Sequence, residues 1–408
     1  MKRAHLLSLI LVITILTATV SLLMSYSQSG NQQKDPVYVG VAFCGNTTTQ
    51  AEALIDRVKS YTNLFVLDCG ISTISNNLSA AREICDYAAN SGLYLIINLG
   101  TWTPHEWPAK IQFYNQSKYM YGDKFLGIYY DDEPAGLIVD YNWTSVFYEN
   151  STYLYGNQSW SLKDIYSRLH IACTTGTHPD NYTQEATWYN TLLKQNRGTT
   201  SLNKYNITYL TSDYMLYWFD YIGGYHTLLA QLGWNNSVNQ EIALVRGAAT
   251  LQNKDWGAII TWKFMQMPYL DTPENIYSQM ETAYNAGVKY IILFNYPQIG
   301  NDPYGGAMTD KHFQKLQNFW NQVVTKSPPN AVHAQAALVL PKDYGWGMRR
   351  ADDKIWGFWG PDDKSPLIWT NLQTLLSQYG SHLDIIYDDP TFPIEGNYSK
   401  VYYWNQTI

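Results

Sequence analysis

Short apolar runs rich in β-branched and aromatic residues alternate with amphipathic segments from residue 37 to about residue 325. The runs have the length of buried strands, and the segments between them repeat apolar residues at helical spacing. The predicted strands are 37–44, 63–69, 93–99, 125–131, 168–174, 207–212, 256–263 and 288–295. The predicted helices are 48–61, 79–92, 185–196, 239–253, 275–287 and 310–324. This alternation predicts an α/β fold, a (β/α)8 TIM barrel with parallel strands.

The predicted fifth strand, 168–174, has the least distinct pattern. It follows an irregular segment rich in Tyr, Asn and Ser, residues 141–163, and its own sequence also fits a helix. If 168–174 is not a strand, seven strands remain, and the run AALVLP at 336–341 is the alternative that closes the barrel.

A Pro- and Ser-containing linker at 326–334 separates the predicted barrel, 37–325, from a C-terminal segment, 335–408. In that segment strand patterns at 336–341, 383–389 and 400–405 accompany a helix pattern at 366–380. We therefore expect a small, incomplete flavodoxin-like α/β unit. It carries neither GxGxxG nor a P-loop, so its sequence gives no support for a nucleotide cofactor.

The first 30 residues predict a signal-anchor. Lys2 and Arg3 precede a charge-free apolar segment, 6–24, that is just long enough to span a bilayer. We expect an uncleaved anchor with the body of the protein on the extracellular face of the membrane, and a cleaved signal peptide of a secreted protein is the alternative. Asn-X-Ser/Thr sequons predict a glycoprotein. They lie at Asn46, Asn77, Asn115, Asn142, Asn150, Asn157, Asn181, Asn206, Asn235, Asn397 and Asn405.

Charge and residue usage narrow the choice of partner. The chain has 27 basic and 34 acidic residues and no basic block after its first residues, which argues against a nucleic-acid partner. Its 35 Tyr and 15 Trp residues suit surfaces that stack on sugar rings, although most of them will serve as core packing. The eight His residues form no paired motif, so we expect no metal.

The chain has only four cysteines, Cys44, Cys69, Cys85 and Cys173, too few for a disulfide scaffold. Cys44 and Cys69 each end a predicted strand, so the two could form a disulfide if these strands are neighbours. Buried free thiols are the alternative.

The residues that follow the predicted strands are candidate site residues, because TIM-barrel active sites lie at the carboxyl ends of the strands. They are Asp68 after the second strand; Asn98, Trp102 and Glu106 after the third; Asp131, Asp132 and Glu133 after the fourth; Asp213, Tyr217 and Trp218 after the sixth; Trp262 and Lys263 after the seventh; and Asn295 after the eighth. Carboxylates, amides and aromatic rings on one rim suit a carbohydrate substrate.

The acidic run Asp131-Asp132-Glu133 is the strongest candidate for chemistry. Desolvation and like charge keep one carboxyl of such a cluster protonated while another stays ionised, and glycoside hydrolysis needs both states. A turn that only caps the next helix or binds a neighbouring cation is the structural alternative.

The segment GIYYDDEPAG, residues 127–136, resembles the end of the fourth strand in the (β/α)8 glycoside hydrolases of the large retaining clan. There Asn-Glu-Pro carries the acid/base glutamate, and here Asp132-Glu133-Pro134 stands at those positions. The layout is also similar to one β-galactosidase family, in which a glutamine-amidotransferase-like domain follows the barrel. The resemblance implies that Glu133 is the general acid/base and that Asp132 contacts the sugar.

The chain departs from that clan at the seventh strand. The clan has its nucleophile glutamate there, whereas this sequence has Trp262 and Lys263, which leaves Asp213 as the nearest alternative base or nucleophile. Lys263 could instead neutralise Asp213 or Glu133 in a barrel without chemistry. Two functions follow as hypotheses: a membrane-anchored extracellular glycoside hydrolase acting on poly- or oligosaccharide, or a non-catalytic glycan-binding or cell-envelope protein on the same scaffold.

Overall fold

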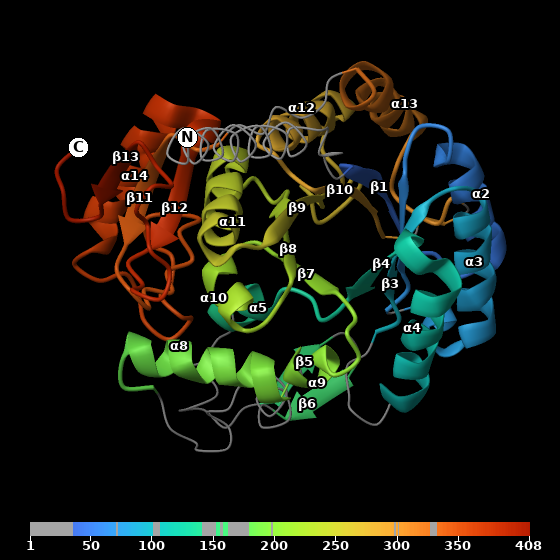
Figure 1. Ribbon diagram of the computed structural model, residues 1–408, viewed down its shortest axis with the longest axis horizontal. Coiled ribbons are helices and arrows are strands. Elements are labelled where there is room, and N and C mark those ends of the chain that lie inside the picture. The colour runs from blue at the N-terminus through green and yellow to red at the C-terminus, as the bar shows by residue number, and fades with distance from the viewer. Residues whose placement is uncertain are drawn as a thin grey trace, which may run out of the picture. The chain divides into compact units, whose positions relative to one another are not determined.

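Eight parallel strands form a closed barrel in the computed structural model, which confirms the predicted TIM barrel (Figure 1). The structure describes residues 36–70, 72–100, 107–140, 152–155, 158–161, 179–196, 199–297, 299–300, 302–326 and 333–408. The barrel strands, in chain order, are β1 (Tyr38–Phe43), β2 (Leu64–Asp68), β3 (Tyr94–Asn98), β4 (Phe125–Tyr129), β7 (Tyr209–Asp213), β8 (Thr227–Leu232), β9 (Asp255–Ile260) and β10 (Tyr290–Asn295). The sheet closes because β1 pairs with both β2 and β10.

One barrel strand, β8, is absent from the strands predicted from sequence. Its sequence, TLLAQL, consists mostly of residues that favour helices, and Thr227 is its only β-branched residue. The predicted strand 168–174 lies outside the described residues. Because β7 is therefore the fifth strand of the described barrel and β8 the sixth, Asp213 ends the fifth strand and Gln231 lies near the end of the sixth.

Helices surround the barrel in Figure 1, and each of the six predicted helices corresponds to an observed one. The helices between barrel strands, or directly after the last one, are α2 (Thr48–Val58), α3 (Leu78–Asn90), α4 (Trp107–Tyr121), α5 (Pro134–Asp140), α8 (Tyr182–Thr191), α9 (Thr199–Asn203), α10 (Tyr217–Ile222), α11 (Val238–Gln252), α12 (Pro273–Asn285) and α13 (Asp310–Phe319). A two-stranded antiparallel pair, β5 (Thr152–Tyr155) and β6 (Gln158–Ser161), lies between α5 and α8 in the sequence.

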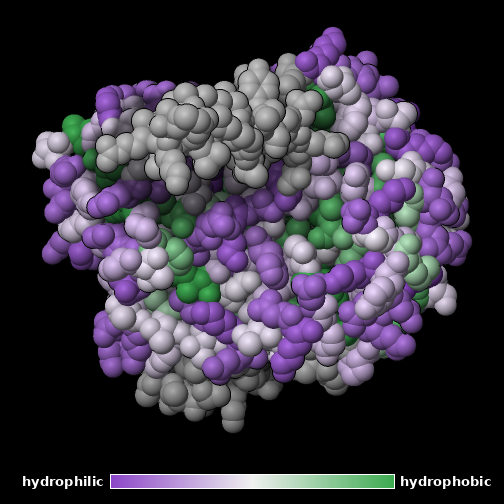
Figure 2. Space-filling model, viewed as in Figure 1, coloured by the Kyte–Doolittle hydropathy of each residue, from purple (hydrophilic) through white to green (hydrophobic). Residues whose placement is uncertain are grey.

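Apolar side chains fill two regions, as expected for strands buried on both faces. One cluster includes the inward side chains of the barrel, such as Leu64, Leu210, Leu229 and Ile292. The larger cluster includes the outward side chains of the strands and the inner faces of the helices. On the face shown in Figure 2 the coloured residues are mainly hydrophilic, with hydrophobic ones in small separate areas.

A separate three-stranded parallel sheet follows the barrel, with β11 (Ala336–Leu340) between β12 (Leu383–Tyr387) and β13 (Lys400–Tyr403). Helix α14 (Ser365–Tyr379) connects β11 to β12. The run 336–341 therefore does not close the barrel. The predicted linker 326–334 lies mostly outside the described residues, so the domain boundary there stays a prediction.

This sheet packs beside α11 (Figure 1), and a buried ion pair joins the two. Arg246 Nε of α11 lies 2.8 Å from Asp384 Oδ1 of β12, and the Arg246 guanidinium also donates to the carbonyls of Ser381 and Leu383. Gly247 is required beside this contact, because a Cβ atom there would lie 2.5 Å from the carbonyl oxygen of Ile385.

The predictions for the N-terminus lie outside the described residues, which begin at residue 36. In the described part of the chain no helix is both long and apolar enough to cross a membrane. The described sequon asparagines are exposed or half-buried, and three of the eleven lie outside the description.

The described cysteines Cys44, Cys69 and Cys85 are buried free thiols, and the structure has no Cys44–Cys69 disulfide. Cys173 lies outside the described residues.

Candidate functional site

The acidic run after β4 forms a tight turn that hydrogen bonds fix to the neighbouring strand β7. Asp131 and Glu133 have φ angles of 61° and 49°, in the left-handed region that non-glycine residues rarely occupy. The Glu133 amide donates to the carbonyl of Ser212 at 3.0 Å, and the Thr211 hydroxyl donates to the carbonyl of Asp131 at 2.9 Å. Such strained backbone persists where surrounding contacts hold it, and it is concentrated at functional sites.

The side chains of this turn join a buried polar network from three strands. Gln231 of β8 donates from Nε2 to Glu133 Oε1 at 2.8 Å and to the Ser212 hydroxyl at 2.9 Å. Asp132 Oδ1 accepts hydrogen bonds from Ser212 Oγ at 3.1 Å and from the Tyr129 hydroxyl. The two carboxyl groups are therefore held side by side at the carboxyl end of the barrel by neutral donors.

The pKa values of both carboxyl groups, Asp132 and Glu133, are raised. Burial raises the pKa of Asp132 well above its usual value, and the charge of Glu133 adds to the rise. The pKa of Glu133 is also raised, mainly by burial, although the hydrogen bond from Gln231 opposes the shift. A carboxyl group that stays protonated at higher pH is suited to donate a proton.

A third carboxyl group, Asp68, completes the cluster from β2. Asn98 of β3 donates from Nδ2 to Asp68 Oδ1 at 2.8 Å. Burial raises the pKa of Asp68 to about 6, while hydrogen bonds from Asn98 and Cys44 lower it. The charge of Asp68 in turn raises the pKa of Asp132, so the two carboxyl groups act on one another. The predicted site residues Asp68, Asn98, Asp132 and Glu133 thus converge, and the half-buried Asp131 belongs to the same turn.

Asp213, predicted as a catalytic carboxylate, instead holds the backbone of the turn. It is fully buried, and its oxygens accept the amides of Ala135 at 2.7 Å, Gly136 at 3.0 Å and Tyr214 at 2.8 Å. Burial raises its pKa well above the usual value and the charge of Asp220 adds to this, while the amides of Ala135 and Tyr214 lower it. Because both oxygens face backbone donors at the start of α5, we assign Asp213 a positioning role and correct the catalytic one.

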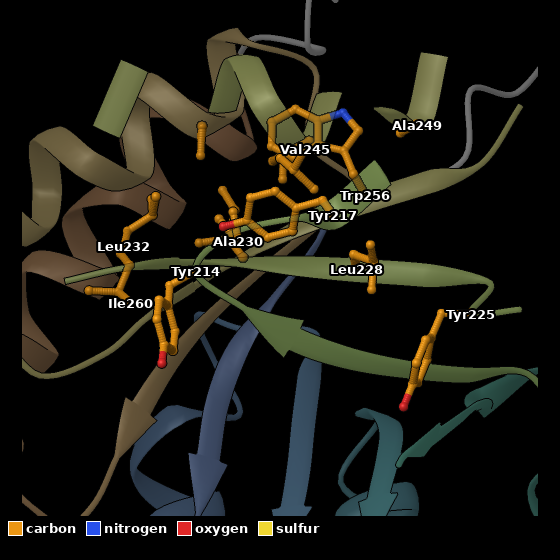
Figure 3. Close-up of a cluster of buried hydrophobic side chains, with 14 of the residues drawn as sticks. Tyr214, Tyr217, Tyr225, Leu228, Ala230, Leu232, Val245, Ala249, Trp256 and Ile260 are labelled. Atoms are coloured by element: carbon orange, nitrogen blue, oxygen red, sulfur yellow. The ribbon is translucent and has the colours of Figure 1, made fainter. Parts of the chain in front are cut away.

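Three predicted sugar-binding residues are core residues. Tyr217 and Trp218 of α10 are 1% and 2% exposed, and Figure 3 shows Tyr217 among apolar side chains such as Val245. Trp218 packs against Tyr387 and Phe392 of the C-terminal segment. Asn295 is fully buried, and its Oδ1 accepts the amide of Met308 at 2.8 Å. Side chains without access to solvent cannot contact a sugar, so these three predictions are corrected.

The ends of β9 and β10 contribute an aromatic pair. The Trp262 and Tyr296 rings stack at 5.5 Å with an angle of 11° between their planes, and Trp262 Nε1 donates to the Tyr296 carbonyl. Lys263 lies 3.1 Å from Asp271. The alternative that Lys263 neutralises Asp213 or Glu133 is therefore wrong. Trp102 and Glu106 lie outside the described residues.

Glu241, on the first turn of α11, is a further buried carboxyl group. It accepts a 2.6 Å hydrogen bond from the Tyr217 hydroxyl, and burial raises its pKa from 4.5 to about 8. Because the folded state binds the proton more tightly, this group contributes stability below about pH 4.5 that is lost as the pH rises to about 8.

We therefore expect Glu241→Gln, which can still accept from Tyr217, to stabilise the protein at pH 8 by about 3–4 kcal/mol relative to its effect at pH 5. Urea denaturation of both proteins between pH 5 and 8 measures this difference. A pH-independent difference would contradict it.

The sequence matches no protein-family model and no curated protein. By structure the chain is similar to GH5_18 from Streptomyces cattleya in complex with GlcNAc, with a TM-score of 0.50 and 10% identity over 91% of this chain and 99% of that one. It is similar to a polyextremophilic β-galactosidase from Halorubrum lacusprofundi, with a TM-score of 0.56 and 10% identity over 90% and 68% of the two chains. For a β-galactosidase from Marinomonas ef1 the TM-score is 0.51, with 11% identity over 90% and 72%. At identities of 10–11% the likeness establishes the fold alone, in agreement with the closed eight-stranded barrel.

Proposed function

We propose that the protein is a glycoside hydrolase that acts on poly- or oligosaccharide, with Glu133 as its general acid/base. The observation that carries the proposal is the Glu133 carboxyl group at the carboxyl end of β4, held by Gln231 beside Asp132, with a raised pKa. The structurally similar proteins also support a carbohydrate substrate, since one is a GH5_18 protein in complex with GlcNAc and two are β-galactosidases.

In this mechanism the protonated Glu133 donates its proton to the glycosidic oxygen as the bond to the anomeric carbon breaks. A second carboxylate then acts as base on the attacking water or as nucleophile. Asp68 is our candidate for it, because Asp68 lies at the end of another strand, is not committed to backbone amides and interacts electrostatically with Asp132. Asp132, between the two, is placed to contact a sugar hydroxyl.

The test is hydrolysis of a panel of oligosaccharides by the purified protein, followed by NMR of the first-formed anomer. Release of reducing sugar that depends on Glu133 and Asp68 supports the proposal. The anomer decides between a retaining and an inverting reaction, which differ in the gap between the carboxyl groups.

The aromatic pair Trp262–Tyr296 is proposed as the sugar-stacking surface of this site. Trp262→Ala is expected to raise KM about tenfold with little change in kcat, since one aromatic contact is worth about 0.5–1.5 kcal/mol. Steady-state kinetics measures the effect, with Tyr119→Ala, which removes a ring 88% exposed on α4, as the matched control. An unchanged KM would remove Trp262 from the site.

We further propose that the protein is a glycoprotein anchored at the extracellular face of the membrane. The charge-free segment 6–24 and the exposed sequon asparagines support this location. Fractionation of producing cells, with and without endoglycosidase treatment, tests it, and unglycosylated protein in the cytosol would contradict it.

The second candidate function is glycan binding without hydrolysis. It is favoured by the residues that follow β9, where Thr261, Trp262 and Lys263 stand and no carboxylate is present. Sugar binding by calorimetry without product formation on any substrate of the panel would select it.

A further inference from the structure

Helix α5, which begins directly after Glu133, is held at both ends by side chains from distant parts of the chain. At its start the carboxylate of Asp213 accepts the amides of Ala135 and Gly136. At its last residue, Asp140, the Tyr214 hydroxyl donates to Oδ2 at 2.8 Å. Since Asp213 is the last residue of β7 and Tyr214 directly follows it, two consecutive residues fix both ends of α5.

A further contact of Asp140 comes from the loop between β11 and α14. Arg349 donates from Nη1 to Asp140 Oδ2 at 3.0 Å and from Nη2 to Asp140 Oδ1 at 2.6 Å, a two-point contact that a lysine could not reproduce. The same guanidinium donates to Asp353 from Nε at 2.8 Å and from Nη2 at 2.9 Å. Asp353 is fully buried and also accepts the Arg349 amide, so the loop holds the arginine rigidly.

Packing between α5 and Tyr214 leaves little freedom for this arrangement. A Cβ atom at Gly136 would lie 2.2 Å from Tyr214 Cζ, so the ring lies directly against the helix backbone. The Arg349 guanidinium lies 5.6 Å from the centre of the same ring. A shift of Arg349 is therefore transmitted to the helix that carries the Glu133 turn.

We propose that Arg349 is a positioning residue for the acid/base Glu133, and that the C-terminal segment acts on the barrel site through the Arg349–Asp140 contact. This inference rests on the proposed function, because it concerns the work of Glu133 in hydrolysis. It gives the segment after the barrel a role in the reaction.

The charges of Arg349 and Asp140 distinguish a positioning role from a purely structural contact, because they act on the pKa of Glu133. Among the described residues, the ionisable groups that interact electrostatically with Glu133 are Asp132 of its own turn, Asp140 of α5, and Asp213 and Tyr214 at the end of β7. The charge of Asp140 raises the pKa of Glu133, and the Arg349 guanidinium partly neutralises Asp140. Loss of Arg349 should therefore raise the pKa of Glu133, whereas loss of the Asp140 charge should lower it.

The test compares the pH profiles of kcat/KM for Arg349→Gln and Asp140→Asn in the full chain. The limb at high pH, where the general acid loses its proton, is expected to move up by about half a pH unit in Arg349→Gln and down by a similar amount in Asp140→Asn, since the pair is partly exposed. Arg349→Lys keeps the charge and loses the two-point geometry, so it is expected to keep the wild-type limb and lower kcat. Arg350→Gln, at an exposed ion pair with Asp352, is the matched control.

A second readout does not depend on activity: ¹³C NMR titration of the Glu133 carboxyl group in the same variants. Opposite shifts of its pKa in Arg349→Gln and Asp140→Asn support the proposal. If Arg349→Gln is too unstable to measure, a lowered pKa in Asp140→Asn together with an unchanged pKa in Arg349→Lys supports it. Shifts of equal sign in Arg349→Gln and Asp140→Asn, or no shift in Asp140→Asn, overturn the proposal. If the wild-type protein hydrolyses no glycoside, the proposed function fails, while the NMR titration still decides whether Arg349 acts on Glu133.

Discussion

Replacement of Glu133 by Gln is expected to lower kcat about 10²–10⁴-fold, the usual contribution of a general acid. The side chain keeps its shape and loses the proton that it donates to the leaving oxygen. Its amide oxygen can still accept the hydrogen bond from Gln231, so the fold and the affinity for a sugar should change little. Steady-state kinetics, thermal denaturation and calorimetric sugar binding on the same preparation separate these effects.

Glu83→Gln provides the matched control, because Glu83 is an exposed glutamate of α3 far along the chain from the turn. It should retain wild-type rates. Unchanged hydrolysis in Glu133→Gln would show that the acidic turn is structural. Activity lost together with the cooperative unfolding transition would instead point to a folding defect in the variant, and Glu133→Asp would then be measured to separate position from proton donation.

The pH dependence of the wild-type enzyme follows from the same groups. Burial raises the pKa of Glu133 above its usual value, and burial raises the pKa of Asp68 to about 6, so Asp68 supplies its ionised form above that pH. We therefore expect kcat/KM, measured against pH, to show one ionisation near pH 6 from Asp68 and a second from Glu133, and Asp68→Asn to remove the first.

The barrel could be predicted from sequence because strands buried on both faces are continuous apolar runs, and this signal is local. Seven of the eight barrel strands overlap a predicted one. β8 was missed for an equally local reason: Leu, Ala and Gln, which favour helices, become a strand here only because the neighbouring strands β7 and β9 pair with them.

Glu133 could be found because three consecutive carboxylates at a strand end are conspicuous. Its partners could not be found in this way, because they are neutral polar residues far away in the sequence. Gln231 contacts Glu133 across 98 positions of the chain, and Ser212 contacts Asp132 across 80 positions. Tyr217 was wrongly predicted to bind sugar, because the sequence does not distinguish an aromatic residue that lines the barrel mouth from one that packs into the core.

Asp213 was predicted to be catalytic for a similar reason. A carboxylate at a strand end reads as a catalytic candidate, and only the fold reveals that its oxygens face the amides of Ala135 and Gly136, which lie 78 and 77 positions earlier in the chain. The structural and catalytic roles of Asp213 make different predictions for its removal.

Asp213→Ala is expected to destabilise the protein by at least about 3 kcal/mol, because it leaves three buried amides without an acceptor and each such loss costs about 1–3 kcal/mol. Urea denaturation at constant pH measures the loss. Asp213→Asn, which keeps one acceptor oxygen, should lose less stability and keep measurable hydrolysis.

If Asp213 were instead the nucleophile or base, Asp213→Asn would be as inactive as Asp213→Ala, and both variants would be nearly as stable as the wild type. The exposed Asp123→Ala, beside β4 in sequence, controls for the loss of one surface charge. Asp213 holds the start of α5 and Arg349 holds its end. The loss of unfolding free energy in the double variant Asp213→Ala/Arg349→Gln should therefore be smaller than the sum of the losses in the two single variants, as expected for groups that act on one shared element.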